Sequence, residues 1–108
     1  MSSARRAGPT SMTLEATDPA GQHPVLVVPD PLTLADVPLL CERLRALYGG
    51  GAELVVCDLA ALSRADLAAV EAVARLRLTA RRAGRRVRMR NAGAGLVALL
   101  ELTGLGGD

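Results

Sequence analysis

The sequence predicts an α/β domain with a β-sheet of four or five strands and helices packed mainly on one face. Short apolar runs of strand length alternate along the chain with longer segments of helical periodicity, as in a small α/β fold. Of the 108 residues, 50% are hydrophobic and 22% are charged, which suits one hydrophobic core and not two. Only three helical segments are available, so we expect the other face of the sheet to be partly exposed.

The first two strands and the first helix are predicted before residue 52. Residues 13–16 form a candidate short strand, and the apolar run at 25–28 forms another, which Pro29-Asp30-Pro31 ends. A helix follows from Thr33, and Gly49-Gly50-Gly51 ends it. The leucines that recur at helical spacing in this segment are Leu39, Leu40, Leu44 and Leu47.

The second half of the chain continues the alternation. Residues 53–58 are apolar without polar alternation, which indicates a central strand buried on both faces. Asp66 is a good N-cap for a helix that ends at Gly84. Residues 86–90 alternate, with Val87 and Met89 on one face and arginines on the other, and a final helix begins at Gly93 or Gly95 and ends at Gly104.

The two ends of the chain carry no pattern of a folded element. We expect a disordered tail over residues 1–11, one domain over 12–106, and a short tail at 107–108. No apolar run approaches the ~20 residues of a membrane span, and the N-terminus has no apolar segment of a secretory signal. The sequence therefore predicts a soluble, cytoplasmic protein that does not insert into membranes.

Composition argues against an enzyme, a cofactor and nucleic-acid binding. Tyr48 is the only aromatic residue, so bases have no platform on which to stack. Cys41 and Cys57 lie in apolar contexts typical of buried, reduced thiols, and His23, the only histidine, lies in a turn. No cluster has metal-ligand spacing, and no glycine-rich loop matches a phosphate-binding motif.

Over residues 13–105 the chain resembles STAS domains, the fold of bacterial anti-sigma-factor antagonists (anti-anti-sigma factors). The resemblance is carried by a strand, the loop and acidic residue after it, and a closing Leu-x-x-Thr-Gly-Leu pattern. These segments are Val55-Val56-Cys57-Asp58-Leu59, Leu62-Ser63-Arg64-Ala65-Asp66 and Leu99-Leu100-Glu101-Leu102-Thr103-Gly104-Leu105. The resemblance implies a mixed sheet and a non-catalytic binding protein in transcription regulation.

The resemblance also implies a switch, which this chain lacks at the usual position. In the antagonists an anti-sigma kinase phosphorylates a Ser or Thr at the start of the second long helix, and the added charge breaks the complex. Here the matching stretch is Asp66-Leu67-Ala68-Ala69-Val70, so the acceptor position is Ala68, which has no hydroxyl. The phosphorylation motif is degenerate, and we expect no switching there.

Helical geometry predicts which residues near this position face a partner. Ala69, Val73, Leu76 and Ala80 share the core arc, whereas Arg75, Arg82, Glu71 and Thr79 lie opposite it. Ala68 is expected on the outer surface. An apolar stripe of Leu67, Ala74 and Leu78 either packs against a neighbouring helix or forms a docking surface. The predicted partner-binding residues are Ser63, Asp66, Leu67, Ala68 and Glu71.

Ser63 has two interpretations. It either forms hydrogen bonds within its turn or serves as an alternative phosphate acceptor. Asp30 and Asp66 are better explained as a turn residue and a helix cap than as catalytic carboxylates.

Charge is distributed unevenly. All thirteen basic residues are arginine, and eight of them lie between Arg75 and Arg90, in a stretch without Asp or Glu. This segment is either a solvated face or a surface for an acidic protein or an anionic lipid, and nucleic acid is the least favoured partner.

Two functions remain open from the sequence. The first is an antagonist-like protein that binds an anti-sigma factor with a histidine-kinase-like ATPase domain. The second follows from Leu62-Ser63-Arg64-Ala65-Asp66, which also resembles STAS subunits of bacterial lipid-transport ABC systems; these brace an ATPase by protein contact. The sequence does not indicate an oligomeric state.

Overall fold

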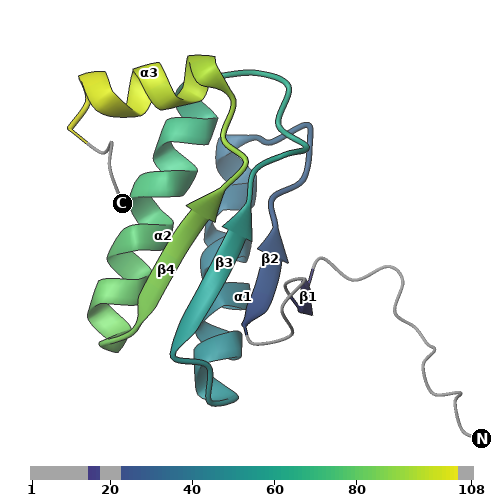
Figure 1. The fold of residues 1–108 in the computed structure, drawn as a ribbon, viewed down its shortest axis with the longest axis vertical. Helices are drawn as coiled ribbons and strands as arrows, with labels where there is room; N and C mark the ends of the chain where they lie inside the picture. The colour runs from purple at the N-terminus through teal and green to yellow at the C-terminus, as the bar shows by residue number, and fades with distance from the viewer. Residues whose placement is uncertain (1–14, 18–22, 105–108) are drawn as a thin grey trace, which may run out of the picture.

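The computed structural model describes residues 15–17 and 23–104, in which four strands form one mixed sheet of order β1-β2-β3-β4 (Figure 1). Their bounds are β1 (Glu15–Thr17), β2 (Pro24–Val27), β3 (Leu54–Asp58) and β4 (Arg86–Arg90). Strand β1 pairs antiparallel with β2, whereas β2–β3 and β3–β4 are parallel pairs. The predicted mixed sheet is confirmed at four strands in this part of the chain.

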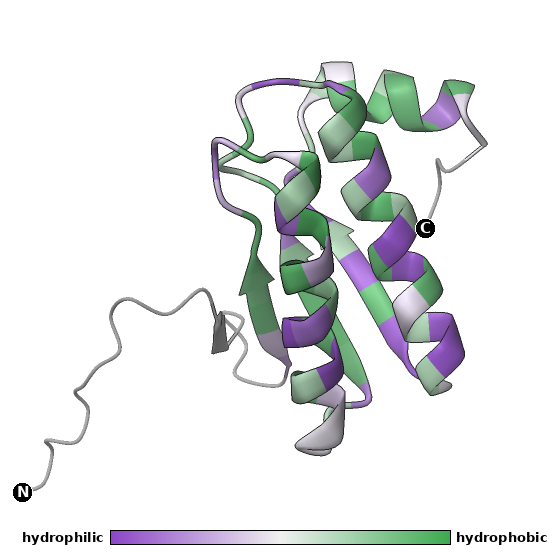
Figure 2. Ribbon diagram, turned by 180° about the vertical axis from the view of Figure 1, so that it is seen from behind, coloured by the Kyte–Doolittle hydropathy of each residue, from purple (hydrophilic) through white to green (hydrophobic). Residues whose placement is uncertain are grey.

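Helices α1 (Val37–Gly49) and α2 (Leu67–Ala83) lie together on one face of the sheet (Figures 1 and 2). A short 3-10 helix, η2 (Leu34–Asp36), precedes α1, and the short α3 (Ala94–Leu102) follows β4 beyond its carboxyl end. The predicted arrangement of helices mainly on one face is therefore confirmed.

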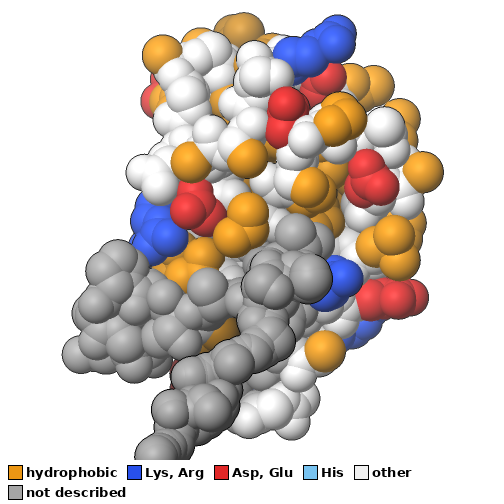
Figure 3. All heavy atoms as spheres, turned by 90° about the vertical axis from the view of Figure 1, so that its right-hand side faces the viewer, with side chains coloured by type: hydrophobic (Ala, Val, Ile, Leu, Met, Phe, Trp, Pro, Cys, Tyr) orange, Lys and Arg blue, Asp and Glu red, His pale blue; other side chains and the backbone are white. Residues whose placement is uncertain are grey.

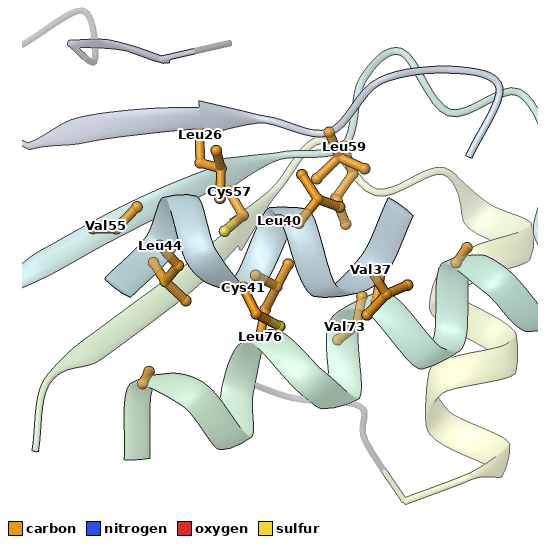
Figure 4. Close-up of a cluster of buried hydrophobic side chains, with 14 of the residues drawn as sticks. Leu26, Val37, Leu40, Cys41, Leu44, Val55, Cys57, Leu59, Val73 and Leu76 are labelled. Atoms are coloured by element: carbon orange, nitrogen blue, oxygen red, sulfur yellow. The ribbon is translucent and has the colours of Figure 1, made fainter. Parts of the chain in front are cut away.

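The core fills the space between the sheet and these two helices (Figure 4). Strand β3 contributes Val55 and Cys57, which are fully buried against leucines and valines of α1 and α2. Both cysteines are free and buried, as predicted, and burial raises the pKa of the Cys57 thiol to about 12. A thiol in this state is neutral and packs as a small apolar side chain.

Strand β3 is buried on both faces, as its apolar run predicts. Its second face carries Leu54 and Val56, which are buried together with Val25 of β2. On the same face of β4, Arg86 and Arg88 are exposed. This face is therefore partly exposed, as expected.

Tyr48 joins the end of α1 to the start of β4. Its ring is buried, and its hydroxyl donates a hydrogen bond of 2.6 Å to the carbonyl oxygen of Arg86. Burial, with a smaller contribution from nearby Cys57, raises the pKa of Tyr48 to about 12.

Two details of the prediction are wrong or only partly testable. Leu39 does not belong to the apolar face of α1 and is 58% exposed, because the buried spacing runs through Leu40, Leu44 and Tyr48. The first strand occupies Glu15–Thr17 instead of 13–16, and Thr13 and Leu14 lie outside the described residues. The predicted tails at 1–11 and 107–108 also lie outside them.

The single tyrosine allows a clean test of this packing. We expect the Tyr48 phenol of the folded protein to ionise near pH 12, and near pH 10 in denaturant. Since the folded pKa is the higher one, this group stabilises the fold fully below about pH 10, and the contribution is lost as pH rises through about 12. Ultraviolet absorbance of the phenolate measures both titrations.

The matched variant is Tyr48→Phe, which keeps the ring and removes the hydrogen bond to Arg86. We expect it to lower the free energy of unfolding by about 1 kcal/mol, measured by denaturant titration. A native titration near the denatured value would contradict the buried position of this hydroxyl.

Candidate partner-binding site

The loop between β3 and α2 is fixed at its start by the carboxylate of Asp58. Its Oδ1 accepts hydrogen bonds from the Ala60 N–H at 2.9 Å and from the Asn91 side chain at 3.1 Å. Its Oδ2 accepts a bond of 3.1 Å from the Arg90 guanidinium. Burial alone raises the pKa of Asp58, but these three donors outweigh it, so the pKa lies below its ordinary value.

Ser63 fixes the middle of the same loop. Its hydroxyl lies 3.1 and 3.2 Å from the two carboxylate oxygens of Asp30, and its N–H lies 3.3 Å from one of them. One interpretation of Ser63 placed its hydrogen bonds within its own turn. Asp30 instead belongs to the loop after β2, so the bond joins two loops. Both residues are exposed.

Asp66 ends the loop and caps α2, as predicted. Its backbone is extended, and Oδ1 accepts a hydrogen bond of 3.1 Å from the N–H of Ala69. The Arg64 guanidinium lies 3.9 Å from Oδ2, an exposed pair that contributes little to stability. The cap places the next residue, Leu67, at the first position of the helix.

Leu67 and Ala68 have opposite environments. The Leu67 side chain is 69% exposed, whereas Ala68 is only 9% exposed. The prediction that Ala68 lies on the outer surface is wrong. Ala68 lies on the same stripe as Ala72 and Leu76, at four-residue spacing, and both of these are buried, so the buried stripe extends to the first turn.

The predicted apolar stripe of α2 faces α1 but is not closed by it. Leu67 and Leu78 line a groove of about 670 Å³ between the two helices, which we call the α1–α2 groove. Leu34 and Val37 line the α1 side. Its charged lining residues are Glu42, Arg45, Glu71, Arg75 and Arg82.

Of the residues predicted to lie opposite the core, Glu71 and Arg75 form an i,i+4 pair on this groove at 2.8 Å. Thr79 does not lie opposite the core, since it is 9% exposed and donates to the carbonyl oxygen of Arg75. The helix is covered by α1 on this side as well as by the sheet, so its buried arc is wider than the angles predicted.

The structure brings together some of the five predicted site residues. Leu67 and Glu71 line the α1–α2 groove, while Ser63 and Asp66 lie in the loop that leads to it. Ala68 follows Leu67 directly in the sequence, but its side chain is buried and does not line the groove. Leu34 and the α1 side of the groove were not predicted, because the periodicity of a sequence does not show which residues of one helix will face another.

The side of the molecule that carries the β1–β2 edge has charges of both signs. Figure 3 looks onto this side, where acidic and arginine side chains are interspersed with hydrophobic ones. Of the eight arginines between Arg75 and Arg90, four lie on α2, three lie on β4 and Arg85 lies between the two elements, toward the other edge of the sheet. Within residues 15–17 and 23–104, no group of three metal-ligating side chains is arranged to hold an ion.

A mixed sheet with two helices on one face defines a small α/β domain, and its capped helix α2 presents an exposed leucine. The chain belongs to the STAS domain family: the family model described as "Mlab, STAS domain" matches residues 15–107. STAS domains are generally non-enzymatic and generally mediate protein–protein interactions, which supports a binding or regulatory role.

The comparison with solved structures agrees with this fold. The NMR structure of the protein TM1081 covers 97% of this chain, and the match spans 83% of that chain, with a TM-score of 0.69. At 12% sequence identity, this likeness shows the fold alone. No curated protein matches the chain. No described helix is both long and apolar enough to cross a membrane.

The cap that positions Leu67 can be tested by substitution. We expect Asp66→Ala to lower the free energy of unfolding by about 1 kcal/mol, because the Ala69 N–H loses its acceptor. The matched variant Asp66→Asn keeps a capping oxygen and should lose much less. Equal stabilities of Asp66→Ala and the parent protein in denaturant titration would show that the cap contributes nothing.

The anchoring carboxylate predicts a dependence of stability on pH. Because the folded pKa of Asp58 is lowered, its contribution is present above the unfolded value of about 3.9 and is lost as pH falls through the lower folded value. We expect Asp58→Asn to cost about 1–3 kcal/mol at neutral pH, and the difference from the parent protein to shrink in acid.

Denaturant unfolding at a series of pH values measures this difference. The control Glu42→Gln removes an exposed carboxylate from α1 and should change stability by less than about 0.5 kcal/mol at neutral pH. A constant difference between Asp58→Asn and the parent at all pH values would contradict the assignment.

Proposed function

We propose that this chain is a non-catalytic STAS-domain protein that binds an ATPase partner through the start of α2 and the α1–α2 groove. Phosphorylation at the usual position does not control the binding. The observation that carries the proposal is residue 68, where the side chain is a methyl group and is buried. Such a position has neither the oxygen that accepts a phosphoryl group nor access to a kinase.

The surface around this position has the character of a docking site. Leu67 and Leu34 are 69% and 52% exposed, and both line the α1–α2 groove. Burying a leucine side chain stabilises a complex by about 1.5–3 kcal/mol, so these two residues are natural anchors. The Glu71–Arg75 pair on the groove supplies polar contacts that orient a partner.

In the proposed function, Ser63 is a positioning residue for the loop that leads to α2. Its hydroxyl already bonds to the carboxylate of Asp30, and a phosphate on Ser63 would place two negative groups side by side. The unmodified hydroxyl holds the loop that leads to Asp66 and Leu67. The domain therefore keeps one binding-competent form in the cytoplasm.

Two ATPase partners fit this function. One is an anti-sigma factor with a histidine-kinase-like domain, toward which the chain would act as a permanently unphosphorylated antagonist. The other is the ATPase of a lipid-transport ABC system. The absent acceptor at residue 68 favours the second partner, because bracing by protein contact needs no phosphorylation.

The test measures binding of the purified protein to each ATPase by calorimetry, with ATP present. We expect Leu67→Glu to weaken binding at least tenfold, because it puts an uncompensated charge at the centre of the contact. The matched control is Leu102→Glu, which makes the same change at an 83% exposed leucine of α3 and should leave binding unchanged. Circular dichroism confirms that both variants fold.

Phosphate incorporation is measured in the same mixtures. We expect none above background in the parent protein or in Ser63→Ala. Incorporation that disappears in Ser63→Ala would overturn the claim that binding is not switched, and equal binding by Leu67→Glu and the parent would overturn the proposed surface.

A further inference from the structure

A second groove, far from Leu67 along α2, is lined by five arginines and three apolar residues. It has a volume of about 450 Å³ and lies where the carboxyl half of α2 meets the start of β4. Figure 2 shows the hydrophilic character of that half of α2 and the alternation along β4. The side chains that line this arginine groove are Leu54, Arg77, Ala80, Arg81, Arg85, Arg86, Val87 and Arg88, with no acidic residue among them.

The fold uses only part of this positive charge. Arg85 donates to the carbonyl oxygen of Ala52 at 2.7 Å and lies 4.0 Å from Glu53. Arg86 and Arg88 are exposed on β4, and their side chains form no ion pair or hydrogen bond within the described residues. Like charges gathered in one groove repel one another, so the fold alone does not explain the presence of Arg86 and Arg88 there.

The backbone beside this groove is an open sheet edge. Strand β4 ends the sheet in the described residues, with β3 on one side only. The Arg86 N–H donates to Glu53 and the Arg90 carbonyl accepts from Leu59, so the backbone groups of residues 86, 88 and 90 point toward β3. The N–H and C=O groups of Val87 and Met89 therefore point away from it, where another strand can pair.

We propose that β4 and the arginine groove bind an extended, acidic segment of a partner protein, which pairs with Val87 and Met89 as an added strand. Arg86 and Arg88 lie on one face of β4, about 7 Å apart, which is the spacing of alternate side chains on a neighbouring strand. Acidic residues at every second position of the segment would therefore face these guanidinium groups.

Other anions fit this groove less well. Nucleic acid would find no aromatic ring for stacking, since Tyr48 is buried. A lipid surface would find no apolar anchor, because none of the large exposed hydrophobic residues lines the groove. Pairing of β4 with β4 of a second copy would set two rows of arginine against each other.

The test uses a capped peptide in which Glu and Val alternate, titrated against the full chain in calorimetry at low salt. We expect Arg86→Gln/Arg88→Gln to weaken binding about tenfold. The matched control Arg45→Gln/Arg64→Gln removes two exposed arginines outside this groove and should change binding less than twofold. A peptide with Gln in place of Glu should bind weakly, and so should one whose alternate backbone nitrogens are methylated.

Several results would overturn the proposal. These are equal losses in the two double variants, equal binding of the methylated peptide, or the absence of binding that depends on Arg86 and Arg88. Tighter binding of single-stranded DNA or of phosphatidylglycerol vesicles through the same two arginines would overturn the class of partner. Leu67→Glu should leave peptide binding unchanged, because Leu67 does not line the arginine groove. The outcome of this test is therefore independent of the proposed ATPase contact.

Discussion

The carboxylate of Asp58 holds together the part of the molecule on which the proposed binding surface depends. It ends the central strand, and its three donors come from the loop toward α2, from the end of β4 and from the residue after β4. The path of the loop from Ala60 to the cap at Asp66 starts from this point. Ser63 and Asp66 then fix the middle and the end of the loop, so three successive polar anchors position Leu67, in addition to the packing of Leu59 and Leu62 against the core.

The near-absence of aromatic rings shapes the rest of the core. Leucine, valine and alanine fill the layer between helices and sheet, and alanines recur along the buried side of α2. Small side chains let a helix approach its neighbours closely. This packing includes Ala68, the position at which the resemblance to the antagonists would place a phosphate acceptor. A serine there would need a partner for a hydroxyl that is largely withdrawn from water. Burial of the position is therefore physically consistent with a residue that has no hydroxyl.

Local signals predicted most of the fold from the sequence, and long-range contacts account for what they missed. Gly84 in the left-handed conformation, the Asp66 cap and the alternation of residues 86–90 each depend on a few neighbouring residues, and each lies where predicted. The bond between Ser63 and Asp30 spans two loops, and the α1–α2 groove depends on how two helices face each other. Ala68 and Thr79 were misplaced for the same reason, since angles on one helix do not show what covers it.

Helix α2 separates two surfaces of different chemistry, and its own electrostatics explain part of that separation. Arg81 and Arg82 lie in its last turn, where positive charge interacts favourably with the helix dipole and with the last carbonyl groups. That argument does not reach Arg86 and Arg88, which lie on a strand and have no dipole to compensate. Charged residues on an edge strand also discourage sheet-to-sheet aggregation, and any charge of either sign would do so. Arg86 and Arg88 carry charge of the same sign and lie beside three more arginines that line the same groove. This concentration of positive charge exceeds what protection against aggregation requires, and it selects an acidic strand over other partners.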